Sequence, residues 1–240
     1  MSMPSRSAAA AERVLDRADA LGVLSRSPHG IDRRYLSPEH RAANDLVAGW
    51  MRDAGLEVWQ DAAGNQCGRL PGAPADAPVL LLGSHLDSVP DAGRYDGILG
   101  VLVAIEVAGR LRAAALPFAL EVVGFGDEEG TRFGATLLGS RAVAGTWDPA
   151  WAGLWDEDGV ALTDAARAFG LDLERVGDAS RAGELLGYLE VHIEQGPWLE
   201  RADRALGVVT RIAAAERRIL TLTGETRTPP RRSSCSSAAR

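Results

Sequence analysis

Apolar runs of two different periods alternate along this chain, and they constrain its fold more than any other feature. Residues 79–85 (VLLLGSH) and 118–125 (FALEVVGF) are apolar on both faces, as are strands buried inside a parallel sheet. Between them, residues 97–114 (GILGVLVAIEVAGRLRAA) predict an apolar helix. Strands that alternate with helices are typical of α/β folds, whose active sites lie beyond the C-terminal ends of the strands.

The rest of the sequence extends this pattern to a mixed, largely parallel sheet with helices on both faces. Ser37 and Pro38 predict the N-cap and the first turn of a helix that stops at Gly55. Further helices are expected at 8–22, within 132–145 and at 161–169, and further strands at 56–61, 65–70, 186–197, 207–212 and 217–224.

Composition excludes several classes of function. The net charge of −7 gives no reason to expect nucleic acid or an anionic membrane as a partner. No apolar run approaches the ~20 residues of a membrane helix, and the N-terminus lacks the apolar core of a signal peptide. Cys67 and Cys235 are the only cysteines, which fits a reducing compartment. We therefore expect a cytoplasmic protein.

Polar side chains gather where three expected strands end. They are His85, Asp87, Asp91 and Asp96 after the first, Asp127, Glu128 and Glu129 after the second, and His192 and Glu194 after the third. Imidazoles mixed with carboxylates suit Zn, Mn or a similar divalent ion. Asp87, two residues beyond His85, could hold the other ring N–H of that histidine. Asp96 begins a helix, where the helix dipole favours an ionised carboxylate, and its two oxygens could bridge two ions. Of the two adjacent glutamates, one could bind metal while the other carries protons.

Each of these pieces has an ordinary structural explanation when taken alone. His85 could be a hydrogen-bonded residue at a strand end, Asp96 a simple helix cap, and residues 127–130 a solvated loop. The ordinary explanation weakens when the pieces are combined, because two of only four histidines follow apolar strands beside acids. The other two, His29 and His40, lie in polar sequence and are expected at the surface.

Three longer motifs carry a family resemblance. They are GSHLDSVPDAGRYDGILGVL (83–102), FGDEEGTRFGATLLGS (125–140) and EVHIEQGP (190–197). Together they resemble the group of allantoate amidohydrolase, β-ureidopropionase and N-carbamoyl-L-amino-acid hydrolase, within the aminoacylase- and carboxypeptidase-like dinuclear metallohydrolases. The resemblance extends over about residues 25 to 224 and implies a zinc-exopeptidase-like catalytic domain.

The resemblance also implies a role for each motif residue. His85 and His192 correspond to ligands of the first metal, Asp96 to the bridge between the metals, Glu129 to a ligand of the second metal, Glu128 to the general base, Asp87 to the residue that orients His85, and Gln195 to a substrate contact. It implies two divalent ions, Zn or Mn, and a metal-bound hydroxide that attacks a ureido or amide carbonyl. We therefore expect hydrolysis of a linear, non-peptide C–N bond in an N-carbamoyl substrate such as allantoate.

The chain departs from the family pattern near its end. Family members continue after TLTGE into a lid domain that mediates homodimerisation, and a later histidine completes their second metal site. Here residues 226–240 are rich in Arg, Ser and Pro, and no histidine follows His192. We expect a chain truncated or frame-shifted after about residue 225, with an incomplete catalytic domain at 1–212, the start of the lid at 213–225 and a disordered tail at 226–240.

Two other functions stay open at this point. An aminoacylase or peptidase of the same superfamily would share the metal ligands, although the GRYDG and HIEQGP motifs favour a ureido substrate. An inactive fragment that binds metal but turns nothing over is the other alternative, since one ligand and the lid contacts are missing.

Overall fold

A five-stranded mixed sheet organises the part of the chain that carries the site. The computed structural model describes residues 6–74 and 76–212, and it divides into one unit that ends at Gln195 and a second that begins at Gly196. The strands of the first unit are β1 (Glu57–Gln60), β2 (Gln66–Arg69), β3 (Val79–His85), β4 (Ala119–Phe125) and β5 (Leu185–Leu189). Their order is β1-β2-β4-β3-β5, and the pairings β4–β3 and β3–β5 are parallel while the other two are antiparallel.

The helices follow the apolar periodicity of the sequence. They are α1 (Arg6–Gly22), α2 (Pro38–Asp53), α3 (Ile98–Leu111), α4 (Leu138–Val143) and α5 (Leu162–Ala168), with 3-10 helices η1 (Pro149–Gly153) and η2 (Leu173–Ala179). Ser37 caps α2 by accepting a hydrogen bond from the backbone amide of His40, and Pro38 occupies its first turn. The described part of the second unit contains α6 (Trp198–Arg201).

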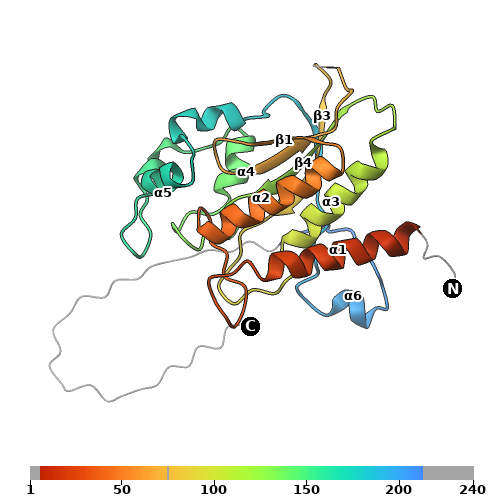
Figure 1. The fold of residues 1–240 in the computed structure, drawn as a ribbon, viewed down its shortest axis with the longest axis horizontal. Helices are drawn as coiled ribbons and strands as arrows, with labels where there is room; N and C mark the ends of the chain where they lie inside the picture. Colours follow the sequence, from red (N-terminus) through yellow and green to blue (C-terminus); the bar gives the residue numbers. More distant parts are fainter. Residues whose placement is uncertain (1–5, 75, 213–240) are drawn as a thin grey trace, which may run out of the picture. The chain divides into compact units, whose positions relative to one another are not determined.

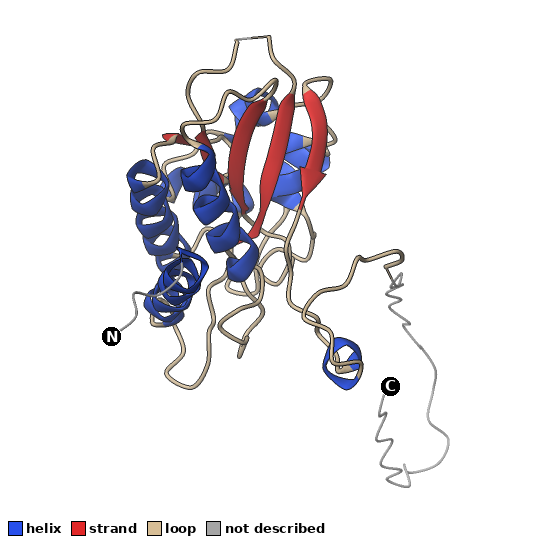
Figure 2. Ribbon diagram, turned by 90° about the vertical axis from the view of Figure 1, so that its right-hand side faces the viewer, coloured by secondary structure: helices blue, strands red, loops and turns tan. Residues whose placement is uncertain are grey.

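Helices cover both faces of the sheet, as expected (Figures 1 and 2). On one face, Leu82 of β3 and Val122 of β4 pack into a core shared with α1, α2 and α3. On the other face, Leu81 and Val123 pack with Val143 of α4. Neighbouring residues of β3 and β4 therefore belong to different cores, which explains why both strands are mostly apolar. The buried exception in β4 is Glu121, which pairs with Arg69 and Arg181.

The parallel register of β3 and β4 determines where the polar side chains meet. His85, the last residue of β3, pairs with Phe125, the last residue of β4. The segment from Asp127 to Glu129 follows two residues later, so it lies at the same edge of the sheet as His85. This is the edge at which α/β sheets place their functional groups.

Two expectations about strands differ from the structure. β5 forms, but it ends at Leu189 and not at residue 197 as expected, and Leu186 and Leu189 are 57% and 60% exposed. Residues 207–212 were expected to be a strand, yet they have no strand conformation, and Val208 is 91% exposed. A strand needs a neighbour to accept its hydrogen bonds, and no described strand pairs with this segment. The expected strand at 217–224 and the expected divisions at 213–225 and 226–240 lie outside the described residues.

His40 is buried, and the expectation that it lies at the surface was wrong. Its side chain is fully enclosed, its ring stacks on Phe169 with 5.3 Å between ring centroids, and its Nδ1 accepts a hydrogen bond from the backbone amide of Leu36. The polar neighbours in sequence did not reveal this, because Phe169 comes from a segment more than a hundred residues away. His29 is exposed, as expected. None of the described helices is long and apolar enough to cross a membrane.

Candidate metal centre

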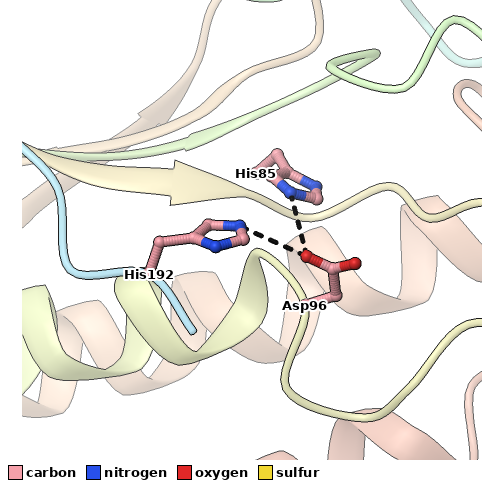
Figure 3. Close-up of side chains that lie close together, drawn as sticks. All are labelled: His85, Asp96 and His192. Carbon is pink, nitrogen blue, oxygen red and sulfur yellow. Dashed lines mark ion pairs between the residues drawn. The ribbon is translucent and has the colours of Figure 1, made fainter. Parts of the chain in front are cut away.

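Three side chains from separate segments converge on one point at the edge of the sheet (Figure 3). His85 ends β3, Asp96 precedes α3 and His192 follows β5. The Nε2 atom of His192 lies 3.2 Å from Oδ1 of Asp96, and the Nε2 atom of His85 lies 3.9 Å from the same oxygen. One possible ligand atom from each residue lies within 4.8 Å of the other two. The expected first-metal ligands are thus close enough to share an ion.

Gly97 allows this convergence. Its φ of +68° lies in the left-handed region, and a Cβ atom on it would come within 2.5 Å of the His85 ring. The chain therefore turns from Asp96 into α3 directly against the imidazole. A larger residue at this position would displace either the ring or the carboxylate.

Glu128 and Glu129 form a second group of candidate ligands with His85. One ligand atom from each of these three residues lies within 4.8 Å of the others. The turn that carries them is fixed by Asp87, whose buried carboxylate accepts the backbone amides of Glu128 at 3.0 Å and Glu129 at 3.2 Å. No group of three candidate ligands joins Asp96 with Glu129 in the described part of the chain, and neither group includes Asp91 or Glu194.

The second ring nitrogen of His85 has a backbone partner. Its Nδ1 lies 2.9 Å from the carbonyl oxygen of Asp87 and 3.8 Å from the carboxylate of the same residue. The expected side-chain hydrogen bond is therefore replaced by one to the backbone. Asp87 orients the imidazole through its carbonyl while its carboxylate holds the two glutamate amides.

Burial and the neighbouring charges shift the pKa values of the ionisable groups around His85. Burial raises the pKa values of Glu128 and Glu129, with Asp87 as a further negative neighbour of both, while the positive form of His85 counteracts the rise. Burial opposes protonation of His85, but the carboxylates of Asp87, Glu128 and Glu129 outweigh it and raise its pKa. Several carboxylates that repel one another around an imidazole are a favourable environment for a cation.

Gln195 lies at the same edge of the sheet. Its side-chain amide donates to both carboxylate oxygens of Asp96, at 3.0 Å and 2.9 Å. The residue expected to contact substrate is therefore next to the carboxylate expected to bridge the metals.

Two buried residues near the site had no predicted role, although Asp127 was among the acids that follow the second expected strand. Asn65 is fully buried and reaches from the β1–β2 turn to accept the amide of Gly126 at 2.9 Å and to donate to the carbonyl of Gly139 at 3.1 Å. Asp127 is also fully buried, with a positive φ of 58°, and neither carboxylate oxygen has a hydrogen-bond partner among the described residues. The Gly64-Asn65 pair indicated only a turn, and the long-range contacts of Asn65 had no local signal.

Comparison with known proteins identifies the family. Residues 81–237 match the sequence profile of peptidase family M20/M25/M40. The chain belongs to this family. The matched region contains all seven of the residues to which site roles were assigned.

Similar proteins agree with this membership. An N-carbamoyl-L-amino acid amidohydrolase from Geobacillus stearothermophilus is 45% identical over 206 residues, which are 84% of this chain and 50% of that protein. An allantoate deiminase from Arabidopsis thaliana is 39% identical over 222 residues, which are 89% of this chain and 42% of that protein. A crystal structure of a hydantoinase/carbamoylase family amidase from Burkholderia ambifaria superposes with a TM-score of 0.72 at 37% identity, covering 80% of this chain and 47% of that one. This M20/M25/M40 chain spans about half the length of the curated relatives it matches.

Proposed function

We propose that this protein is a metal-dependent amidohydrolase that cleaves a linear, non-peptide C–N bond in an N-carbamoyl or ureido substrate. The observation that carries the proposal is the convergence of His85, Asp96 and His192, together with a second group in which His85 lies close to Glu128 and Glu129. The similar proteins named above support the substrate class, because an N-carbamoyl amino acid and allantoate both contain a ureido group.

The donor atoms fit a borderline divalent ion. Two imidazoles with one carboxylate, and one imidazole with two carboxylates, are ligand types that Zn²⁺ and Mn²⁺ accept in proteins. The Nδ1 atom of His85 already has a partner, which leaves its Nε2 available on the side of Asp96. We propose two ions, held by His85, His192, Asp96 and Glu129. When bound, such ions supply Lewis acidity, which makes water a stronger nucleophile near neutral pH and polarises a carbonyl.

Glu128 is the proposed general base. It is half-buried, and burial raises its pKa above the ordinary glutamate value, toward the range in which a carboxylate can both accept and return a proton. Its carboxylate takes a proton from the attacking water and passes it to the departing nitrogen. Asp87 fixes the position of Glu128 by accepting its backbone amide. Gln195 is the proposed substrate contact, since an amide can donate to a carboxylate or carbonyl of the substrate as it does to Asp96.

Ammonia release tests the proposal directly. The 240-residue chain, loaded with Zn²⁺ or Mn²⁺, is assayed with allantoate, with N-carbamoyl-β-alanine and with dipeptides. We expect ammonia from at least one ureido compound and slower release of amino acids from dipeptides. Faster dipeptide cleavage would assign the chain to the aminoacylase and peptidase branch of the superfamily instead.

A matched pair of variants separates catalysis from background. Glu128→Gln removes the proposed base, and Glu174→Gln makes the same change at an exposed position of η2. We expect turnover to survive only in the second variant. Metal binding by the wild-type chain without any turnover would favour the alternative of an inactive metal-binding fragment.

A further inference from the structure

Arg33 is a buried cation that contacts the residues on either side of Asp87. Its side chain is among the largest fully buried ones, and the residue is 1% exposed. It lies in the segment between α1 and α2, in sequence far from every candidate ligand. Burying a guanidinium is costly unless its charge and its N–H groups are compensated.

The guanidinium is compensated by backbone oxygens. Its Nε donates to the carbonyl of Leu86 at 2.7 Å, and its Nη1 donates to the carbonyls of Leu21 and Leu24 at 2.9 and 3.1 Å. No carboxylate lies within ion-pair distance of it in residues 6–74 and 76–212. Burial lowers the pKa of Arg33 to about 10, while the carboxylate of Asp87 acts in the opposite direction. The group is therefore positively charged near neutral pH.

The backbone of Arg33 is hydrogen-bonded to Ser88, in the segment that follows β3. Its amide donates to Oγ of Ser88 at 3.0 Å, and its carbonyl accepts the amide of Ser88 at 3.0 Å. Arg33 thus contacts the residue before Asp87 and the residue after it. The intervening Asp87 turns its carbonyl to Nδ1 of His85 and its carboxylate to the amides of Glu128 and Glu129.

We propose that Arg33 is a positioning residue of the metal centre. Through its contacts with Leu86 and Ser88, it holds residues 86–88 so that the Asp87 carbonyl faces His85. Removal of Arg33 would free this segment and leave the carbonyl oxygen of Leu86 without its guanidinium donor. The inference rests on the proposed metal function, because Arg33 itself touches none of the candidate ligands and acts through Asp87.

A purely structural role is the competing explanation. Arg33 also joins the end of α1 to the sheet through Leu21 and Leu24. If that were its whole role, Arg33 variants would unfold more easily but would bind metal as the wild type does once folded. Metal affinity and stability must therefore be measured separately.

The experiment compares Arg33→Met and Arg33→Lys with Arg17→Met. Arg17 is a partly buried arginine of α1 that pairs with Glu106 and lies over Trp50. The control substitution therefore removes the same chemical group at a position away from the candidate ligands. The full 240-residue chain is stripped of metal, its stability is measured by urea unfolding, and Zn²⁺ is titrated by calorimetry. We expect Zn²⁺ affinity to fall by about tenfold or more in Arg33→Met. We expect the Zn²⁺ affinity of Arg33→Lys to lie between those of Arg33→Met and the wild type, because lysine restores the charge but not the planar guanidinium. Arg17→Met should lose stability and keep wild-type affinity.

The outcomes separate this inference from the proposed function. If the wild-type chain binds no Zn²⁺ or Mn²⁺, the proposed metal function is wrong, and this inference falls with it. If the wild type binds Zn²⁺ and folded Arg33→Met binds equally well, only the inference is overturned. Should Arg33→Met fail to fold, Arg33→Lys decides, since affinity below that of the wild type supports the positioning role and unchanged affinity overturns it.

Discussion

The side-chain amide of Gln195 donates to both carboxylate oxygens of Asp96, at 3.0 Å and 2.9 Å. An amide that faces both oxygens of a carboxylate can exchange one of them for an oxygen of the substrate without leaving its place. The proposed substrate contact of Gln195 would therefore need no movement of its side chain.

For Gln195→Ala, we expect KM for the ureido substrate to rise by about tenfold with a smaller change in kcat, as follows from loss of a contact made equally in the ground and transition states. Steady-state kinetics, together with Zn²⁺ titration, measures this. If Zn²⁺ affinity fell while KM stayed constant, Gln195 would serve to orient Asp96 and not to bind substrate.

Glu128 and Glu129 should respond differently to the same substitution. Glu128→Gln is expected to lower kcat by roughly 10²- to 10⁴-fold, the range for loss of a general base, and to retain bound metal. Glu129→Gln should lower the amount of tightly bound metal, because it removes a proposed ligand. Metal content measured by mass spectrometry on both purified variants checks the assignment, and the opposite pattern would exchange the two roles.

Gly97→Ala tests the tight turn beside His85. A methyl group there would come within 2.5 Å of the imidazole, at a φ of +68° that L-residues adopt with strain. We expect a loss of roughly 1–3 kcal/mol in unfolding free energy, together with weaker Zn²⁺ binding. Gly93→Ala is the control, since nothing lies within 4 Å of its added methyl group. Equal behaviour of the two variants in urea unfolding and calorimetry would show that the turn does not constrain His85.

The buried His40 should lower the free energy of unfolding as the pH becomes acidic. Burial lowers its pKa to about 3 from the usual 6.5, with the charges of Arg33 and Arg41 acting in the same direction. Because the folded-state pKa is the lower one, the unfolded chain takes up a proton first as the pH falls below 6.5, and stability is lost from there toward pH 3. Between pH 6.5 and pH 4.5 this loss is about 2 kcal/mol.

Urea unfolding of wild type and His40→Asn at the two pH values isolates this contribution. Asparagine keeps an acceptor for the Leu36 amide but cannot be protonated in this range. The difference in stability between the two proteins should therefore shrink by about 2 kcal/mol as the pH is lowered from 6.5 to 4.5. A difference that stays constant with pH would mean that His40 is not the source of the acid sensitivity.

The elements around the site were predictable because their signals are local. The apolar runs at 79–85 and 118–125 each fill two cores, and the Ser37-Pro38 pair begins α2 as its cap chemistry requires. His85, Asp96 and His192 were expected to meet for a related reason. Residues at the C-terminal ends of parallel neighbouring strands lie at the same end of the sheet, which brings His85 and His192 together. Asp96 joins them through the Gly97 turn that leads into α3.

The features that escaped prediction depend on contacts across the chain. The burial of His40 depends on Phe169, and the role of Asn65 depends on Gly126 and Gly139. The partner of His85 was placed on the carboxylate of Asp87, whereas a backbone turn that no residue pattern specifies brings the carbonyl there instead.

Because His192 follows the edge strand β5, local unfolding of β5 would disrupt the candidate metal site. His192 follows an edge strand that pairs only with β3 in the described sheet, while His85 belongs to the interior strand β3. Fraying of β5 would remove His192 but leave His85 and Asp96 in place. Because an ion held by all three must favour the closed strand, backbone amides of β5 should exchange their hydrogens for deuterium more slowly when Zn²⁺ is present. The thermodynamic cost of closing one strand is thus part of the affinity for the ion.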